Sequence, residues 1–172
     1  KVPLKKMNSE ENLQLQICSL DYSSFVGRIG IGRITAGKIS AGQNAWLCRG
    51  PASGPETVKI SQVLKFKGLE RVAVEEAFAG DIVLITGINQ IGIGDTVCDV
   101  GHLNALPLLK VDEPTLTMNF MVNNSPLVGR EGKYVTSRQL KDRLQKELQS
   151  NVALKVEFTK DSDTFVVSGR GE

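Results

Sequence analysis

The segment that comes nearest to a nucleotide-binding motif runs from Gly32 to Lys38 and matches the pattern GxxxxGK. A phosphate-binding loop needs Ser or Thr after the Lys, because that hydroxyl binds magnesium, and it must open a helix whose N-terminus holds phosphate. Here Ile39 follows Lys38, and the next residues lead into another apolar run. The segment therefore predicts a β-hairpin turn rather than a phosphate loop.

The acidic and histidine residues offer no catalytic set. Asp95 and Asp99 could suggest a catalytic carboxylate pair, but no further acid–base residues accompany them. Asp95 follows Gly94 in a turn, where Asp commonly makes local side-chain hydrogen bonds. The single histidine, His102, lies in a turn-like segment with no Ser or Cys nucleophile beside it in the sequence. We therefore expect turn carboxylates, a surface histidine and no catalytic residue.

The three cysteines, Cys18, Cys48 and Cys98, are widely spaced and form no CxxC pair. With one histidine in the chain, they cannot supply four zinc ligands at the usual spacing. Their odd number and their apolar neighbours indicate reduced thiols of a cytoplasmic protein. The sequence thus predicts no metal and no bound cofactor in this chain.

Basic residues give a modest signal for nucleic acid. Arg28 and Arg33 lie on a Gly-rich ribbon, whose small residues we expect to expose the backbone. Between Arg130 and Glu147 there are six Arg/Lys and three Asp/Glu, so this segment has a net positive charge that could contact phosphate. The alternative is an ordinary solvated helix face. Aromatic residues make up only 5% of the chain, which disfavours a base-stacking platform.

The residues before Pro107 have the pattern of a small closed β-barrel. Leu13 to Leu20 alternates apolar and polar side chains, and Gly-rich turns separate the short runs that follow. No helical period longer than two turns occurs here. We predict strands at 13–20, 27–35, 45–48, 57–67, 81–86 and 96–97, with at most one helical turn at 73–79.

The pattern changes after Pro107 to one helix among strands. An apolar stripe of Val135, Leu140, Leu144 and Leu148 predicts a helix at 133–150, and Asn151 is its expected C-cap. Strands are predicted at 114–122, 153–159 and 164–168, the last two joined by a turn at 160–163. This order gives four elements of a split β-α-β-β-α-β unit, without its second helix and fourth strand.

A sheet with one helix leaves part of a face uncovered. We therefore expect the natural chain to continue past Glu172. We also expect this chain to associate with itself through the uncovered sheet. The apolar residues expected to lose cover are Phe120, Val156, Phe158, Val166 and Val167.

The amino-acid composition is that of a globular protein. The chain has 172 residues, 41% of them hydrophobic, and a net charge of +2, which disfavours disorder. No apolar run reaches the roughly 18 residues of a membrane span, and the charged start lacks the apolar core of a signal peptide. We predict a mainly β fold with an α+β part: a β-barrel in residues 1–107 and an incomplete β-α-β-β domain in residues 108–172.

The segment from Asp21 to Gln43 resembles the opening of the second domain of translational GTPases. In that family Gly-Arg pairs precede a Gly-x-(Ile/Val)-x-x-Gly segment, which here are Gly27-Arg28, Gly32-Arg33 and Gly37 to Gly42. The resemblance covers nearly the whole chain. It is most specific to the BipA/TypA branch at LDYSSFVGR (20–28), DEPT (112–115), NSPLVGREGK (124–133), TSR (136–138) and VSGRGE (167–172).

The resemblance implies a domain-two-like barrel followed by a truncated ferredoxin-like third domain. The whole factor would be a cytoplasmic, ribosome-binding GTPase of translation, ribosome assembly and stress adaptation. Its barrel would rest on small-subunit ribosomal RNA, and its third domain would couple the GTPase domain to the subunit interface. GTP and magnesium would bind in the GTPase domain, whose P-loop this chain lacks, so we expect no GTP hydrolysis here. The implied partners are the ribosome and the factor's own GTPase and C-terminal domains, without a membrane.

Charge and motif position select the candidate contacts with ribosomal RNA. These are Arg28, Arg33 and Lys38 on the barrel, and Arg130, Lys133, Arg138 and Lys141 in the third domain. For Arg33 the alternative is an ion pair within the barrel. Two other functions stay open: a fragment of a factor like elongation factor G or LepA, or a self-contained nucleotide-binding module that uses Gly32 to Lys38.

Overall fold

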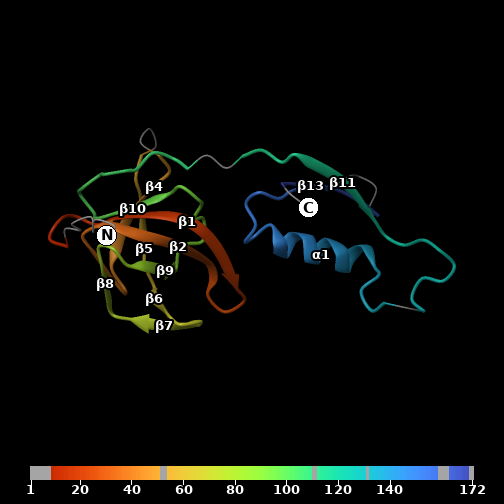
Figure 1. The fold of residues 1–172 in the computed structure, drawn as a ribbon, viewed down its shortest axis with the longest axis horizontal. Helices are drawn as coiled ribbons and strands as arrows, with labels where there is room; N and C mark the ends of the chain where they lie inside the picture. The colour runs from red at the N-terminus through yellow and green to blue at the C-terminus, as the bar shows by residue number, and fades with distance from the viewer. Residues whose placement is uncertain (1–8, 51–53, 110–111, 131, 159–162, 171–172) are drawn as a thin grey trace, which may run out of the picture. The chain divides into compact units, whose positions relative to one another are not determined.

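The computed structural model describes residues 9–50, 54–109, 112–130, 132–158 and 163–170. The chain divides into two compact units, Lys1–Lys110 and Val111–Glu172, and each unit has its own β-sheet (Figure 1). Strands dominate both units, as predicted, and α1 is the single helix of the described ranges. No helix in these ranges has the length and apolarity that crossing a membrane requires.

The first unit is built from short antiparallel strands. Eight of them form one sheet in the order β5-β4-β10-β1-β2-β9-β6-β7, and β3 pairs with β8. The first strand therefore lies between β2, its neighbour in sequence, and β10, which comes near the end of the unit. The strands are β1 (Gln14–Ser23), β2 (Gly27–Ala36), β3 (Lys38–Ser40), β4 (Asn44–Cys48), β5 (Glu56–Lys59), β6 (Gln62–Lys67), β7 (Glu70–Val74), β8 (Glu76–Phe78), β9 (Ile82–Thr86) and β10 (Thr96–Cys98).

The barrel core follows from strand alternation. Leu15 and Ile17 of β1 are fully buried, whereas Gln14 and Gln16 lie on the other face, because successive side chains of a strand point to opposite sides. The interior is almost entirely aliphatic. It contains Leu13, Leu15, Ile17, Leu20, Ile34, Ile39, Ala45, Leu47, Ile60, Val63, Ala77, Val83, Ile85, Ile88, Ile91 and Val97.

Two predicted elements of the barrel are wrong. The single strand expected at 57–67 is divided into β5 and β6, because the chain changes its pairing partner there. The Ile60 N–H still bonds Gln43, next to the β4–β5 ladder, whereas the Ser61 N–H bonds Thr86, where the ladder of β6 with β9 begins. The helical turn considered at 73–79 is absent. Those residues complete β7, which pairs with β6, and form β8, which pairs with β3.

The second unit has the order β11 (Leu116–Met121), α1 (Ser137–Glu147), β12 (Lys155–Phe158) and β13 (Thr164–Gly169). In the sheet, β13 lies between β11 and β12 and is antiparallel to both. Hence β11 and β12 run in the same direction, with a helix in the connection and a strand inserted between them, as in a split β-α-β unit. Of the hairpin turn predicted at 160–163, residues 160–162 lie outside the described residues.

The helix is shorter than its apolar stripe predicts. Thr136 is the N-cap: its hydroxyl accepts the Gln139 N–H at 3.4 Å while the Gln139 side chain accepts the Thr136 N–H, which is a capping box. The C-cap is Leu148, not Asn151 as predicted. Residues 149–151 instead form turns whose N–H groups reach the carbonyls of Lys146 and Glu147.

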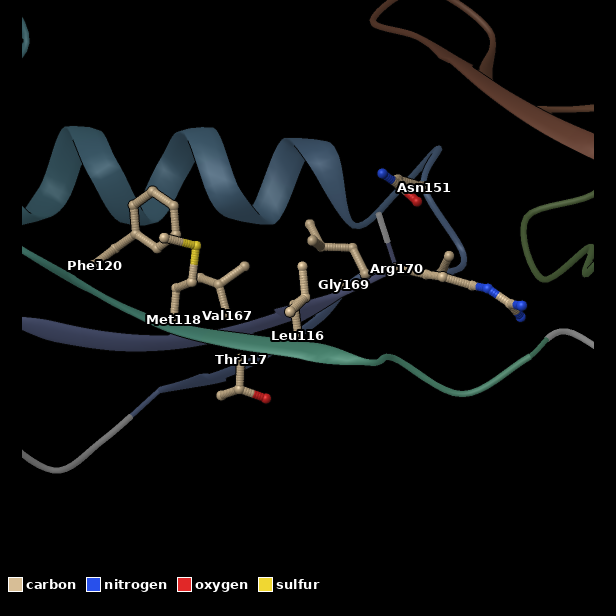
Figure 2. Close-up of a pocket in the computed structure, with 10 residues that line it drawn as sticks. Leu116, Thr117, Met118, Phe120, Asn151, Val167, Gly169 and Arg170 are labelled. Carbon is tan, nitrogen blue, oxygen red and sulfur yellow. The ribbon is translucent and has the colours of Figure 1, made fainter. Parts of the chain in front are cut away.

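One face of the small sheet is only partly covered. Figure 2 shows Leu116, Met118, Phe120 and Val167 on the side of the sheet that carries the helix, with Thr117 on the other side. A groove of about 720 Å³ lies along these apolar residues. The expected loss of cover holds for Phe120 and Phe158, which are each 42% exposed. It is wrong for Val167, which is buried, and Val156 and Val166 are half-buried.

Candidate nucleic-acid interface

Gly30 and Gly32 of β2 allow neighbouring residues of the barrel to pack closely against the strand, and they do not expose its backbone. A Cβ on Gly30 would lie 2.5 Å from Cδ1 of Ile91, and a Cβ on Gly32 would overlap the carbonyl oxygen of Gln16. Both glycines are buried. The expectation that this ribbon exposes its backbone is therefore wrong, because the space in front of these glycines is filled by neighbouring strands and by Ile91.

The two arginines of β2 differ in their surroundings. The Arg28 guanidinium is half-buried and donates from Nη1 to the carbonyl of Ile91 at 3.2 Å, which fixes it against the loop after β9. Arg33 is exposed and makes no side-chain hydrogen bond or ion pair with any residue that the structure describes. Because five positions separate them on one strand, the two arginines point to opposite faces of β2.

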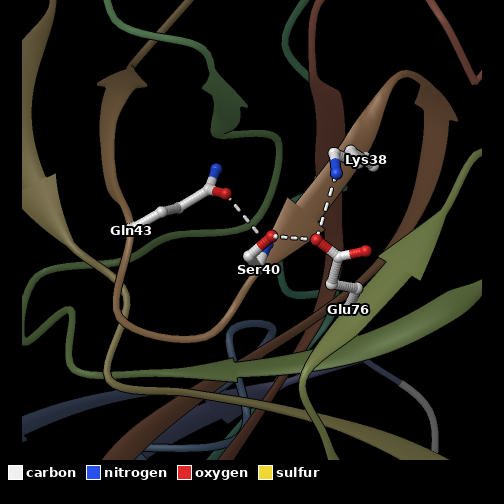
Figure 3. A network of polar contacts seen from close by, with 4 residues as sticks. All are labelled: Lys38, Ser40, Gln43 and Glu76. Atoms are coloured by element: carbon white, nitrogen blue, oxygen red, sulfur yellow. Dashed lines mark hydrogen bonds and ion pairs between the residues drawn. The ribbon is translucent and has the colours of Figure 1, made fainter.

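Lys38 is neutralised within the barrel. Its Nζ lies 3.0 Å from Oε1 of Glu76, and the same oxygen accepts the Ser40 hydroxyl at 3.2 Å (Figure 3). These bonds, with the positive charge of Lys38, lower the pKa of the exposed Glu76 carboxyl below its usual value. The Ser40 N–H in turn donates to Oε1 of Gln43 at 2.8 Å. Lys38 is thus part of a surface network that joins β3 to β8.

The segment around Gly37 is a corner between strands and not a phosphate loop. Gly37 has φ 73°, and a Cβ there would lie 2.6 Å from the backbone of Glu11 and Leu13. The chain enters β3 directly, with no helix. The predicted hairpin is not formed either, because β3 pairs with β8 and β2 pairs with β1 and β9.

We expect the isolated chain not to bind GTP. The GxxxxGK segment offers no helix N-terminus, Ile39 replaces the magnesium-binding hydroxyl, and Lys38 is ion-paired. Isothermal titration with GTP and magnesium checks this. Micromolar binding to the 172-residue chain would contradict it and favour a self-contained nucleotide module.

Three cations lie at the entry to α1: Arg130, Lys133 and Arg138, which we call the α1-entry cations. All three are exposed, and none has a side-chain hydrogen bond or ion pair to any residue in the described ranges. Arg130 ends a turn in which its N–H reaches the carbonyl of Leu127 at 3.2 Å. Arg138 lies in the first turn of α1, which contains no acidic residue.

Lys141 has a local role that the charge pattern does not reveal. Its Nζ lies 5.5 Å from the centroid of the Phe158 ring, a cation–π contact between α1 and β12. Phe158 packs edge-on against Phe165 of β13, with 5.8 Å between ring centroids. Lys141 is therefore placed against the sheet of its own unit.

Several basic residues outside the predicted set are also neutralised. Arg143 pairs with Glu147 at 2.6 Å along α1, and Arg71 pairs with Asp21 at 2.5 Å between two hairpins. Lys65 and Arg49 likewise pair with Asp81 and Glu56. Of the seven predicted contact residues, Arg33 and the α1-entry cations make no side-chain hydrogen bond, ion pair or cation–π contact in the described ranges. Arg28 and Lys141 also lack an acidic partner, but they contact Ile91 and Phe158.

The two most exposed apolar side chains of the described residues lie at hairpin tips and were not predicted from the sequence. Phe25 at the tip of the β1–β2 hairpin is 96% exposed, and Leu69 at the tip of the β6–β7 hairpin is fully exposed. Their signal in the sequence is an apolar residue in a turn, next to Ser24 and Gly68 respectively. The Asp21–Arg71 ion pair joins the stems of these hairpins, so the two tips belong to linked elements. A bare aromatic ring suits stacking on a nucleic-acid base.

The remaining polar groups support the fold. Burial raises the pKa of Asp95, although the Gly92 N–H, 2.7 Å from its Oδ2, opposes this. Asp99 accepts the Leu13 N–H at 2.7 Å, and His102 is exposed. The structure shows no group of three or more His, Cys, Asp or Glu side chains suited to a metal in the ranges it describes.

Known proteins are similar to this chain over both of its units. The family model of elongation factor Tu domain 2 matches residues 27–98, the body of the barrel. A solved structure from Thermus thermophilus superposes with a TM-score of 0.65 over 94% of this chain and 23% of its own length. At 17% identity, that likeness concerns the fold alone.

Relatives at higher identity cover almost the whole sequence. The large ribosomal subunit assembly factor BipA of Bacillus subtilis is 50% identical over 171 residues, or 99% of this chain. BipA of Escherichia coli CFT073 is 52% identical, and that of Salmonella typhimurium 50%, over the same length. The chain spans 28% of the length of each of these relatives. Since half of the residues are identical along nearly the entire sequence, the chain belongs to the BipA/TypA family.

Proposed function

We propose that this chain is a ribosome-contacting and interdomain-coupling part of a BipA-type translational GTPase. The α1-entry cations would contact ribosomal RNA phosphates from the second unit, and Arg33 would do so from the barrel. The relatives are named large ribosomal subunit assembly factors, which supports ribosomal RNA as the partner. GTP and magnesium would bind in other parts of such a factor, because these residues provide no phosphate loop.

The observation that carries the proposal is the division of the cations into two classes. Lys38, Lys65, Arg71 and Arg143 each have a carboxylate within 3.0 Å. The α1-entry cations and Arg33 have no acidic partner among the residues described, although they are exposed. An unpaired exposed cation keeps its full charge for a polyanion, whereas a paired one must first give up its partner.

The position of the α1-entry cations adds a second argument. The N-terminus of a helix carries a partial positive charge, which disfavours a cation in the first turn. Arg138 stands there without a compensating carboxylate in that turn. A phosphate bound near the helix entry would relieve this repulsion, and helix N-termini are favourable sites for phosphate.

The direct test is the salt dependence of ribosome binding. Triple replacement of Arg130, Lys133 and Arg138 by Ala is expected to weaken cosedimentation with ribosomes. It should also flatten the slope of log affinity against log salt by about 2–3 units, because each phosphate contact contributes roughly 0.7–0.9. Arg33→Ala should flatten the slope by about one unit. Separate assays with each ribosomal subunit would assign the contact.

A matched control removes three charges that are already paired, through Lys38→Ala, Arg71→Ala and Arg143→Ala. This variant loses the same net charge but should keep nearly the original slope, because its cations are engaged within the protein. Equal slopes for the two triple variants would show that only net charge matters and would refute the assigned contacts. For Arg33, an unchanged slope with a lowered melting temperature would indicate a structural role instead.

A further inference from the structure

Part of the outer surface of the barrel is buried although it faces away from the core. Cys48, Thr96 and Cys98 have no exposed surface, yet they alternate with the core residues Leu47 and Val97. In the sheet, Thr96 lies between Gln16 and Cys48, and Cys98 lies between Gln14 and Trp46. Something outside the sheet must therefore cover this strip of β1, β10 and β4.

The cover is the segment Leu103–Leu109, which we call the strap. It has no regular secondary structure and is held by bonds to outward-facing side chains. Gln14 donates to the carbonyl of Asn104 at 3.0 Å, and Gln16 donates to that of Pro107 at 2.7 Å. The Leu106 N–H donates to the Thr96 hydroxyl at 3.0 Å.

The strap also shields a pair of thiols. The Cys48 and Cys98 side chains are close enough to influence each other, and the backbone of Asn104 in the strap lies next to Cys98. Burial raises the pKa of the Cys48 thiol to about 11. Both cysteines are free, as is the exposed Cys18.

Three of the four leucines in the strap keep about half of their surface exposed, whereas Leu106 is half-buried. The side chains of Leu103, Leu108 and Leu109 are 51%, 52% and 41% exposed. The two glutamine bonds are at the surface, where water can replace either partner at small net cost. Segments with few buried contacts and exposed hydrogen bonds open at lower free energy than the core. The strap is thus held by a small set of contacts that can break while the aliphatic core of the barrel stays packed.

The strap leads directly into the connection between the two units. Asp112 forms an ion pair with Arg170, and the Thr115 N–H donates to the carbonyl of Gly169 at 3.1 Å, so the second unit fixes the chain from there on. While the strap is docked, only residues 110 and 111 lie between these contacts and Leu109.

We propose that the strap is a detachable tether that sets the length of chain available between the barrel and Asp112. Its release would add the seven residues Leu103–Leu109, or about 25 Å of extended chain, to that length. Release would also uncover Cys48 and Cys98. This inference concerns the barrel and its connection alone and does not depend on ribosome binding.

Cysteine alkylation measures the release. The 172-residue chain is treated with iodoacetamide in native buffer, and peptide mass spectrometry follows the three cysteines separately. We expect Cys48 and Cys98 to react together, at a rate that depends far less on urea than global unfolding measured by far-ultraviolet circular dichroism. Replacing Gln14 and Gln16 by Ala should raise the rate at both cysteines about tenfold. Cys18, which is already exposed, should react at an unchanged rate.

Two further variants make the experiment decisive. Gln62→Ala removes an exposed strand glutamine that does not contact the strap, and it should leave all three rates unchanged. Leu108→Ala removes the side chain that packs against Gly50, and it should accelerate Cys48 and Cys98 even if the double glutamine variant folds poorly. The proposal is overturned if Cys48 and Cys98 react only through global unfolding, with the same urea dependence as the circular dichroism transition. It is also overturned if the strap variants react no faster than Gln62→Ala.

Discussion

Replacing Gly37 by Ala is expected to destabilise the barrel by about 3–5 kcal/mol, a large part of the stability of a domain this size. The residue has φ 73°, and a Cβ would lie 2.6 Å from Glu11 O and Leu13 N. These are backbone atoms of the segment that enters β1, so no side-chain rotation can relieve the overlap. Urea unfolding followed by the fluorescence of Trp46, the only tryptophan in the sequence, reports on this unit.

Gly42→Ala separates the two contributions to that loss. Gly42 has φ 81°, so alanine there meets the same backbone penalty of about 1–2 kcal/mol. No heavy atom lies within 4 Å of the position that its Cβ would take, so no overlap is added. The difference between the variants therefore measures the collision at the β2–β3 corner. Equal losses would mean that the corner adapts and that the packing around Gly37 is not restrictive.

Replacing Phe165 by Ala is expected to unfold the second unit while leaving the barrel intact. Phe165 is 3% exposed and lies in β13 opposite both Phe120 and Phe158. Deleting a buried Phe side chain costs about 3–5 kcal/mol, and this small unit has few other buried side chains in the described residues. The far-ultraviolet circular dichroism of α1 should be lost at lower urea, with the Trp46 transition unchanged.

Phe120→Ala is the matched control for this prediction. Phe120 is in the same sheet but is 42% exposed, so its removal should cost only about 1 kcal/mol. Parallel shifts of the Trp46 and helix transitions in Phe165→Ala would show that the two units unfold as one. Gly37→Ala should give the opposite pattern, with the Trp46 transition shifted and the helix signal retained.

The sequence predicts the strands and helix well where local periodicity is strong. Leu140 and Leu144 locate α1, and the alternation around Leu15 locates β1. The start of α1 is less well predicted, because the Thr136–Gln139 capping box begins the helix after Val135, the first residue of the apolar stripe. The break at Ile60 also escapes prediction, since it depends on a change of pairing partner from β4 to β9, which is far along the chain.

The candidate site is predicted less well because charge pairing depends on strand register. Lys38 and Glu76 are far apart in sequence and meet only because β3 pairs with β8. Lys141 belongs to the basic segment, but its contact with Phe158 requires the fold of the second unit. Burial of Cys48 and Cys98 likewise follows from a strap without periodicity. The family, in contrast, is identified from short segments such as LDYSSFVGR (20–28) and NSPLVGREGK (124–133). Their resemblance can be read from the residues alone, without knowledge of these distant contacts.

The position of β1 between β2 and β10 has a consequence for how the chain folds during synthesis. Gln14 pairs with Ala36 early, but its other neighbour, Cys98, is made only 62 residues after Ala36. At translation rates of roughly 5–20 residues per second, the ribosome needs about 3–12 s to deliver it. During that interval β1 presents an unpaired edge beside its apolar residues, a state prone to misassociation. The barrel can therefore close only after its last strand has emerged, which makes Thr96–Cys98 the step that completes its folding.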